Sequence, residues 1–292
     1  MYVISTEGLV SKGFLVLAQN TEGVDYIKQA YALALSIKIS QSTVTDISLV
    51  TNDVVPKKYQ KVFDQIIPIP FRDDAINSTW KVENRWKLFH ASPYHETIVL
   101  DTDMLLLEDI GTWWEYCSNH ELAFCSRIKN YKLETIIDTV HRRAFQSNNL
   151  TNPYFALHYF KKSQLALEFY KVLEFVCNNW EWAWTKFAPV DYQNWLSMDL
   201  ASAVAIEIMG GHQGIIDNAS PLEFIHMKTA IQGWQPLPAS WQDTVPFVLN
   251  TKGNLVVGNI KQTKLFHYVE KDFLSKDIVA RLEDLANGKK KN

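Results

Sequence analysis

Two aspartates, Asp101 and Asp103, stand one residue apart at the end of the apolar run TIVL, which has the length of a buried strand. Alternate residues of an extended chain project to the same side, so we expect the two carboxylates to converge while Thr102 points away. Two carboxylates directed at one point repel each other and raise each other's pKa unless a cation lies between them. A divalent cation would resolve this conflict; the alternative is a solvated loop in which neither carboxylate binds anything.

The ligand types also indicate which cation such a site would hold. Mg²⁺ and Mn²⁺ prefer hard oxygen ligands and typically keep coordination positions open for water or for the phosphates of a substrate. The spacing of Asp101 and Asp103 therefore predicts a Mn²⁺ or Mg²⁺ site that can hold a diphosphate.

The first half of the chain alternates between strand and helix patterns. Apolar β-branched runs bounded by polar residues predict strands, and apolar residues at helical spacing predict helices. Strands alternating with helices indicate a parallel α/β sheet, which binds ligands beyond the carboxyl ends of its strands. The expected strands are 13–20, 46–53, 65–70 and 97–100, and the expected helices are 26–40 (capped by Asp25), 59–63 and 80–92. The aspartate pair thus follows a strand end, where this architecture places active sites.

The second half is less regular. The patterns predict a strand at 121–126, amphipathic helices at 132–145 and 163–177, a helix at 198–209, a hairpin at 247–259 and a last helix from Ser275 to Gly288. No repeat, low-complexity tract or linker interrupts the chain, so we expect residues 1–292 to form a single domain.

The composition indicates a folded globular protein and gives no sign of a nucleic-acid or membrane protein. The chain has 292 residues, of which 47% are hydrophobic, enough for a folded globular core. A net charge of -3 provides no global basic field for nucleic acid or anionic membranes. The three cysteines form no CxxC pair, which indicates buried, reduced thiols. With no leader segment and no apolar run of membrane-spanning length, we expect a soluble, cytoplasmic protein.

The run TIVLDTDMLLLEDI resembles the central signature of the GT-A glycosyltransferases, in particular the family 8 group that includes glycogenin. FLVLAQNTEGVDYIKQAYALALSIK resembles the first strand and helix of that group, SLVTND its second strand, and NRWKLFHASPY the segment that carries a basic residue before the DxD motif. The resemblance implies a GT-A, Rossmann-like fold, with a mixed, mostly parallel sheet flanked by helices. Residues 1–110 would form the nucleotide-sugar-binding half, and residues 111–292 a more irregular acceptor-side half with a C-terminal helix.

The resemblance also implies roles for residues around the donor. Asp101 and Asp103 would ligate the metal that bridges the donor diphosphate, and Asp103 would also take part in catalysis. Arg85 or Lys87 would neutralise phosphate, with Lys87 favoured by position. The nucleotide would be lined by Ala18, Gln19, Asn20, Thr21 and Thr102.

Further along the chain, the resemblance implies a catalytic acidic residue and a third metal ligand. Asp199, in SMDLASA, is the candidate for holding the transferred sugar, although Leu200 replaces the glutamine of the family motif. The family's third ligand is a histidine followed by a phosphate-holding lysine. Two pairs fit this pattern: His226 with Lys228, and His267 with Lys271. Chain order favours His267 with Lys271, and the other pair would then line the sugar or acceptor pocket.

The function implied is that of a metal-dependent hexosyl- or pentosyltransferase. It would move a sugar from a nucleoside diphosphate sugar, expected to be a UDP-sugar, to an acceptor hydroxyl with retention of configuration. A saccharide acceptor could stack on tryptophans of the second half, the candidates being Trp180, Trp182, Trp184, Trp195, Trp234 and Trp241.

A second acceptor remains open. The chain also resembles compact GT-A proteins encoded by bacteriophages, some of which glycosylate modified bases in DNA, so a hydroxymethylated base is an alternative acceptor in a phage-infected host cell. Basic residues that could contact DNA phosphates lie in HRRAFQSNN, at Lys161 and Lys162, and in the lysine tail 289–291.

Two other functions compete with glycosyl transfer. A DxD phosphatase is disfavoured because its motif normally ends the first core strand, whereas the strands 13–20 and 46–53 already precede the motif here. A non-catalytic carbohydrate-binding protein is disfavoured because it needs no metal for a diphosphate.

Overall fold

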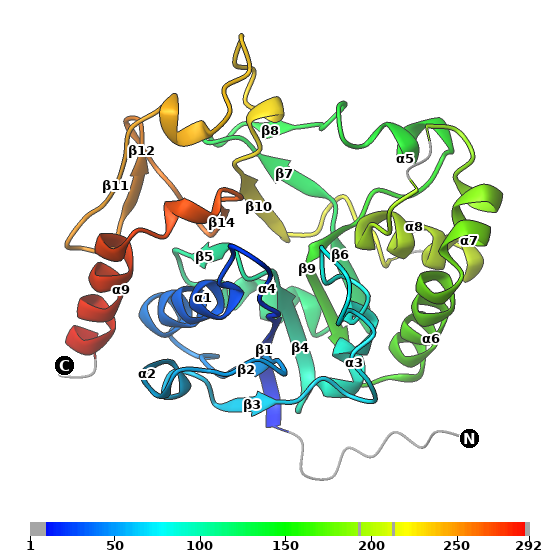
Figure 1. Cartoon of the computed structure of the whole chain (residues 1–292), viewed down its shortest axis with the longest axis horizontal. Helices are drawn as coiled ribbons and strands as arrows, with labels where there is room; N and C mark the ends of the chain where they lie inside the picture. Colours follow the sequence, from blue (N-terminus) through cyan, green and yellow to red (C-terminus); the bar gives the residue numbers. More distant parts are fainter. Residues whose placement is uncertain (1–9, 192–193, 212–213, 290–292) are drawn as a thin grey trace.

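A six-stranded sheet with the strand order β3-β2-β1-β4-β9-β6 forms the centre of the molecule (Figure 1). The structure is a computed structural model that describes residues 10–191, 194–211 and 214–289. Only β9 runs against the other five strands, which confirms the mixed, mostly parallel sheet. The strands are β1 (Val10–Leu17), β2 (Ile47–Val50), β3 (Gln65–Ile67), β4 (Tyr94–Leu100), β6 (Leu122–Cys125) and β9 (Tyr154–Lys161).

Both faces of this sheet are buried, which explains why its central strands are apolar throughout. Phe14 and Val16 share one core with α1 and α4, whereas Leu15 and Val99 share another with α3, α6 and α8. Helix α7 packs against α6 and α8. The helices are α1 (Tyr26–Ser40), α3 (Leu88–Ala91), α4 (Gly111–Cys117), α6 (Gln164–Asn178), α7 (Trp180–Phe187) and α8 (Met198–Ile208).

A second sheet joins the two halves of the chain. Its order is β5-β14-β10-β7-β8, and β5 from the first half pairs antiparallel with β14 near the C-terminus. The expected hairpin is confirmed as β11 and β12, and α9 packs on α1. The remaining elements are β5 (Met104–Leu106), β7 (Arg127–Lys129), β8 (Thr135–Ile136), β10 (Glu223–His226), β11 (Phe247–Leu249), β12 (Leu255–Val257), β13 (Ile260–Lys261), β14 (Leu265–His267), α2 (Lys57–Gln60), α5 (Arg143–Ser147) and α9 (Lys276–Lys289). None of the described helices has the length and apolar character needed to cross a bilayer.

Two predicted helices are wrong over most of their length, for the same physical reason. Within 80–92, only a 3₁₀ turn at Arg85–Lys87 and α3 are helical, because the side chain of Asn84 bonds to Gln19 and Asp73. Within 132–145, a short strand and α5 replace the helix, because Asn130 accepts hydrogen bonds from the backbone of Lys132 and Glu134. Asparagine side chains that bond to nearby groups compete with the helix.

Two smaller boundaries also differ. The helix expected at 59–63 is α2, which starts directly after Pro56, a residue whose fixed φ suits the start of a helix. The last helix does not end at Gly288 but continues to Lys289, whose Nζ bonds to carbonyl oxygens of Ile39 and Gln41 at the end of α1.

Candidate active site

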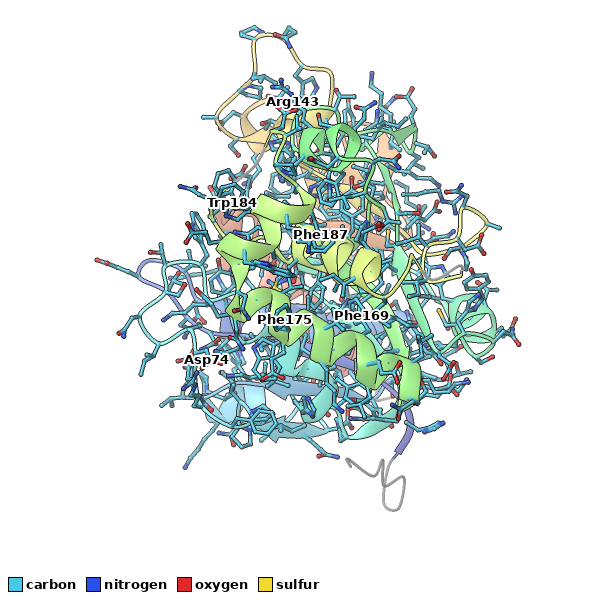
Figure 2. The ribbon with its side chains drawn as sticks, turned by 90° about the vertical axis from the view of Figure 1, so that its right-hand side faces the viewer. Asp74, Arg143, Phe169, Phe175, Trp184 and Phe187 are labelled. Atoms are coloured by element: carbon cyan, nitrogen blue, oxygen red, sulfur yellow. The ribbon has the colours of Figure 1, made fainter. Side chains whose placement is uncertain are left out.

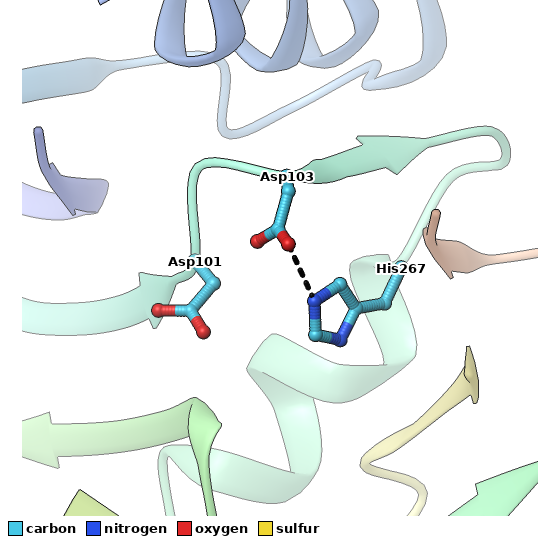
Figure 3. Close-up of side chains that lie close together, drawn as sticks. All are labelled: Asp101, Asp103 and His267. Atoms are coloured by element: carbon cyan, nitrogen blue, oxygen red, sulfur yellow. Dashed lines mark ion pairs between the residues drawn. The ribbon is translucent and has the colours of Figure 1, made fainter. Parts of the chain in front are cut away.

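Asp101 and Asp103 lie in the turn that joins β4 to β5, at the carboxyl end of a central strand (Figure 3). The expectation that strand alternation makes them converge is wrong, because residues 101–103 form a turn and not an extended strand. The N–H of Asp101 still donates to the Ala156 carbonyl oxygen (3.0 Å), whereas Met104 already begins β5. The turn therefore brings the carboxylates together, with Thr102 buried between them.

His267 completes a cluster with the two aspartates. Its Nε2 lies 3.0 Å from Oδ2 of Asp103, and one ligand atom from each of the three residues lies within 4.8 Å of the others. The pairing of β5 with β14 sets Met104 opposite His267, and the N–H of Tyr268 donates to the Asp103 carbonyl oxygen (3.1 Å). Backbone pairing thus fixes residues from distant parts of the chain side by side.

Two protein cations lie against the aspartates. Nη1 of Arg85 is 2.5 Å from Oδ1 of Asp101, and Nζ of Lys271 forms an ion pair with Asp103. Burial alone would raise the pKa of Asp103, but the charges of and hydrogen bonds from His267 and Lys271 outweigh burial and hold this pKa well below its ordinary value. Asp103 therefore stays ionised at neutral pH.

The cluster fits a hard divalent cation. Two carboxylates and one imidazole form a donor set suited to Mn²⁺ or Mg²⁺. Arg85 and Lys271 pair with the two carboxylates from the rim of the cluster, which shows that both carboxylates face cationic partners. The imidazole Nδ1 of His267 is buried without a partner among the described residues, and its Nε2 faces the carboxylates.

His226 lies behind His267 and not between the aspartates. Parallel pairing of β10 and β14 sets the two histidines opposite each other, with ring centroids 4.7 Å apart and nearly parallel planes. Burial, and then the charge of His267, hold the pKa of His226 well below its ordinary value. The structure thus brings His267 to the cluster, the residue favoured by chain order. Lys228 is partly buried nearby, and burial lowers its pKa despite the proximity of Asp199.

Asp199 lies in the first turn of α8, with both carboxylate oxygens engaged. Oδ1 accepts from the N–H of Phe155 (2.7 Å), and Oδ2 lies 2.8 Å from Nη2 of Arg142. Arg142 is buried, stacks on the ring of Tyr154 at 3.7 Å from its centre, and donates to the Pro153 carbonyl oxygen (3.2 Å). The sequence analysis missed this role of Arg142, because nothing in HRRAFQSNN distinguishes a buried arginine from an exposed one.

The candidate nucleotide residues form the loop after β1, at the same sheet edge. Ala18 is buried, and the N–H and carbonyl of Thr21 pair with Val24. Gln19 donates to Asp73 (2.9 Å), while Oδ1 of Asn20 accepts from the backbone at the start of α1 (3.2 Å). These contacts hold the loop in place.

Of the two candidate basic residues, the structure brings Arg85 to the aspartates and not Lys87. Lys87 is fully buried, with its Nζ 2.8 Å from Asp74 and 2.7 Å from Oδ1 of Asn84. Its ammonium therefore holds the loop before α3 and is enclosed by protein.

Comparison with known proteins places the fold. No protein-family model and no curated protein sequence matches the chain. The galactosyltransferase LgtC, in complex with donor and acceptor sugar analogs, superimposes with a TM-score of 0.50 at 12% identity over 94% of this chain and 95% of LgtC. Mouse xyloside xylosyltransferase 1 matches with a TM-score of 0.49 at 11% identity, over 88% of this chain and 97% of that protein.

A further match is the glycosyltransferase GlyE of Streptococcus pneumoniae TIGR4, with a TM-score of 0.38 at 13% identity. It covers 69% of this chain, which spans less than half, 44%, of GlyE. The fold assignment rests on the likeness to LgtC, which extends over nearly the whole of both chains. The protein therefore has the GT-A fold, with an Asp-Asp-His cluster at the carboxyl edge of its main sheet.

Proposed function

We propose that the protein is a metal-dependent glycosyltransferase that moves a sugar from a nucleoside diphosphate sugar to an acceptor hydroxyl. The observation that carries the proposal is the cluster of Asp101, Asp103 and His267 at the ligand-binding edge of a GT-A sheet. Bound there by these three residues, Mn²⁺ or Mg²⁺ would act as a Lewis acid toward the phosphate oxygens of the donor.

Positively charged side chains of the chain would stabilise the leaving diphosphate. Arg85 and Lys271 are already held against the cluster, and Lys228 lies close enough to interact with Asp103 and Asp199. Preorganised charges of this kind act where negative charge develops in the transition state. The loop 18–21 would hold the nucleoside.

Asp199 would hold the transferred sugar. Each of its carboxylate oxygens accepts one hydrogen bond from the protein, and a carboxylate has about four acceptor positions, which leaves room for sugar hydroxyls. We propose transfer with retention, and UDP as the nucleotide, as the family 8 resemblance implies.

We propose a saccharide as the acceptor, with a hydroxymethylated DNA base as the alternative. Most of the basic residues considered for DNA contact are engaged within the protein. Lys161 donates to the Ser118 carbonyl oxygen, and burial lowers the pKa of Lys162 to about 8. In the segment HRRAFQSNN, Arg142 pairs with Asp199, and Arg143 is the one arginine that is strongly exposed. Lys289 contacts α1, while residues 290 and 291 lie outside the described part of the chain.

Thermal unfolding with UDP, in the presence of Mn²⁺ or a chelator, tests the proposal. We expect UDP to raise the melting temperature only with metal, because the metal would hold its diphosphate. At a hundred times its Kd, a bound ligand adds about 2.7 kcal/mol of stability to the folded state. Asp103→Ala should abolish this shift relative to its own ligand-free state. Asp284→Ala, which removes an exposed carboxylate of α9, should keep it.

Stabilisation by UDP that survives chelation would contradict the proposed site. A donor screen with Mn²⁺ then separates enzyme from binding protein: metal-dependent release of UDP from a UDP-sugar supports transfer or hydrolysis. Binding of UDP-sugars without turnover of any of them would instead support a non-catalytic protein with this fold.

A further inference from the structure

A surface hollow of about 590 Å³ lies where α6 ends and α7 begins. Figure 2 looks onto these two helices, with Phe175 of α6 and Phe187 of α7 labelled. The chain bends at Asn179 between the two helices. Trp180 and Trp182 supply the aromatic lining, and the other lining side chains are all polar. Its volume falls within the range of about 300–1,000 Å³ that ligand pockets usually have. None of the residues that form the Asp-Asp-His cluster lines it.

Trp182 provides a fixed aromatic surface. Its ring meets Phe175 and Phe187 edge-on, with centroids 5.3 Å and 5.7 Å away, so neighbouring rings restrain its orientation. The side chain is nevertheless 44% exposed. By contrast, Trp241 is fully buried and donates from Nε1 to the Tyr268 carbonyl oxygen, so it belongs to the core. A restrained, exposed indole is suited to stacking on the apolar face of a sugar ring.

Hydrogen-bonding groups surround this surface. Nδ2 of Asn179 donates to the Phe175 carbonyl oxygen (2.8 Å), which leaves its Oδ1 as an acceptor, and the Thr185 hydroxyl donates to the Glu181 carbonyl oxygen (2.6 Å), which leaves its lone pairs. The indole Nε1 of Trp180 is buried without a partner among the described residues. Because this N–H is buried, the groups that the hollow offers to a ligand are Oδ1 of Asn179 and the Thr185 hydroxyl, and not the Trp180 indole.

The charges of the hollow balance. Its lining contains one carboxylate, Glu181, and one ammonium, Lys186, whose Nζ lies 5.5 Å from the centre of the Trp182 ring. Binding to a phosphate chain depends on several cations that displace its counterions. One balanced pair beside hydroxyl and amide groups therefore favours a neutral, hydroxyl-rich ligand over a nucleic acid.

We propose that the hollow beside Trp182 is a subsite for a neutral oligosaccharide. Helix α7 packs against α8, whose first turn carries Asp199, so the hollow and the residue proposed to hold the sugar lie on neighbouring helices. Building on the proposed glycosyl transfer, it would hold sugar residues of the acceptor that do not react. Binding at the hollow itself requires neither donor nor metal.

Indole N–H signals in ¹H–¹⁵N spectra of the full chain test the subsite directly. Trp180→Phe and Trp182→Phe assign the two signals, and maltohexaose, cellohexaose and chitohexaose are added up to about 10 mM, which detects a millimolar Kd. We expect at least one hexasaccharide to shift both signals. Trp182→Ala should weaken this binding about tenfold or more, followed through the Trp180 signal. Trp80→Ala, which removes a 73% exposed tryptophan outside the hollow, should leave binding unchanged.

The proposal is overturned if none of the three hexasaccharides shifts the two signals. It is equally overturned if a thymidine decanucleotide shifts them and the saccharides do not. UDP binding to the Trp182→Ala variant is measured in parallel and should match the wild type. Loss of saccharide binding can thus be told apart from failure of the donor site, which the Asp103→Ala experiment reports.

Discussion

Arg142 is the residue whose role depends most on atomic detail. It joins Asp199 to the ring of Tyr154 and to the carbonyl oxygen of Pro153, directly before β9, so the position of the Asp199 carboxylate depends on it. Arginine suits this position because its planar fork can stack and donate in several directions at once, whereas lysine is a point charge. We therefore regard Arg142 as a positioning residue for Asp199, the carboxylate that we propose holds the sugar.

Arg142→Lys should lower kcat about tenfold to a hundredfold while leaving the Kd for UDP unchanged. The reason is that displacing a group in the active site by about 1 Å can lower the rate by this factor. Arg142→Met should lower kcat further, since it removes the charge as well. Arg143→Met is the matched control, because Arg143 is exposed and its nearest carboxylate, on Asp191, is 3.8 Å away. Equal effects of the variants at 142 and 143 would refute the positioning role.

His158 makes stability depend on pH. It is fully buried in β9; its Nδ1 donates to the Phe155 carbonyl oxygen (2.9 Å), and the Tyr170 hydroxyl donates to Nε2 (2.7 Å). Burial lowers its pKa to about 3, with a smaller contribution from Arg85. Because the folded pKa lies below the unfolded pKa of about 6.5, the unfolded chain binds the proton first and stability falls as pH drops from 6.5 toward 3.

We expect the wild type to lose about 2 kcal/mol more than His158→Gln when urea unfolding is compared between pH 7 and pH 5. The variant lacks the titrating ring, so the difference between the two pH dependences isolates this histidine from the others. The same loss in both proteins would show that His158 does not control acid sensitivity.

At the scale of elements, the packing of β1 against β4 depends on a missing side chain. A Cβ added at Gly13 would stand 2.3 Å from two ring atoms of Tyr94, whose hydroxyl is hydrogen-bonded to Ser48 (2.7 Å). The sequence predicts both strands, but it does not show that the Tyr94 ring occupies the space where a side chain at position 13 would lie. The ring of Tyr94 therefore requires a residue without a Cβ at position 13, on the strand next to the one that leads into Asp101.

Gly13→Ala should lower the free energy of unfolding by about 1–3 kcal/mol, the usual cost of overpacking a core. In a Tyr94→Val background, which removes the ring, most of this cost should disappear. Gly288→Ala is the matched control, because nothing lies within 4 Å of its added Cβ and alanine favours a helix such as α9. Urea unfolding is measured for the wild type, the Gly13→Ala and Tyr94→Val variants, their double variant and the Gly288→Ala control. An unchanged cost of Gly13→Ala without the ring would argue against the clash.

At the scale of the whole molecule, the two halves of the chain complete each other. Leu106 of β5 lies opposite Leu265 of β14, and both belong to the core that covers β1 and β4. His267 reaches the aspartates through this same pairing. The Asp-Asp-His cluster and the shared core therefore depend on the same contact between β5, in the first half of the chain, and β14, near its C-terminus.

A fragment of residues 1–110 should not fold alone, because its β5 loses the pairing with β14 and its main sheet loses β9 and β6. Circular dichroism during heating should show no cooperative transition, whereas the full chain should show one. Cooperative unfolding of the fragment would mean that residues 1–110 form an independent domain, contrary to the single domain expected from the sequence.

The sequence by itself determined the alternating α/β pattern, the strand that leads into Asp101, and the importance of the aspartate pair. Apolar periodicity is a local property, and buried strands and amphipathic helices show it directly. It failed at 80–92 and 132–145, where Asn84 and Asn130 bond to nearby groups and override the helical pattern.

Only the tertiary structure decided which distant residues meet. The register of β5, β14 and β10 decided that His267, and not His226, lies beside the aspartates. Burial of Lys87 in the core decided that Arg85 is the basic residue that reaches them. Arg142 became visible only through its contact with Asp199. Each of these outcomes depends on strand pairing and burial between segments far apart in the chain, which the spacing of residues within one segment does not encode.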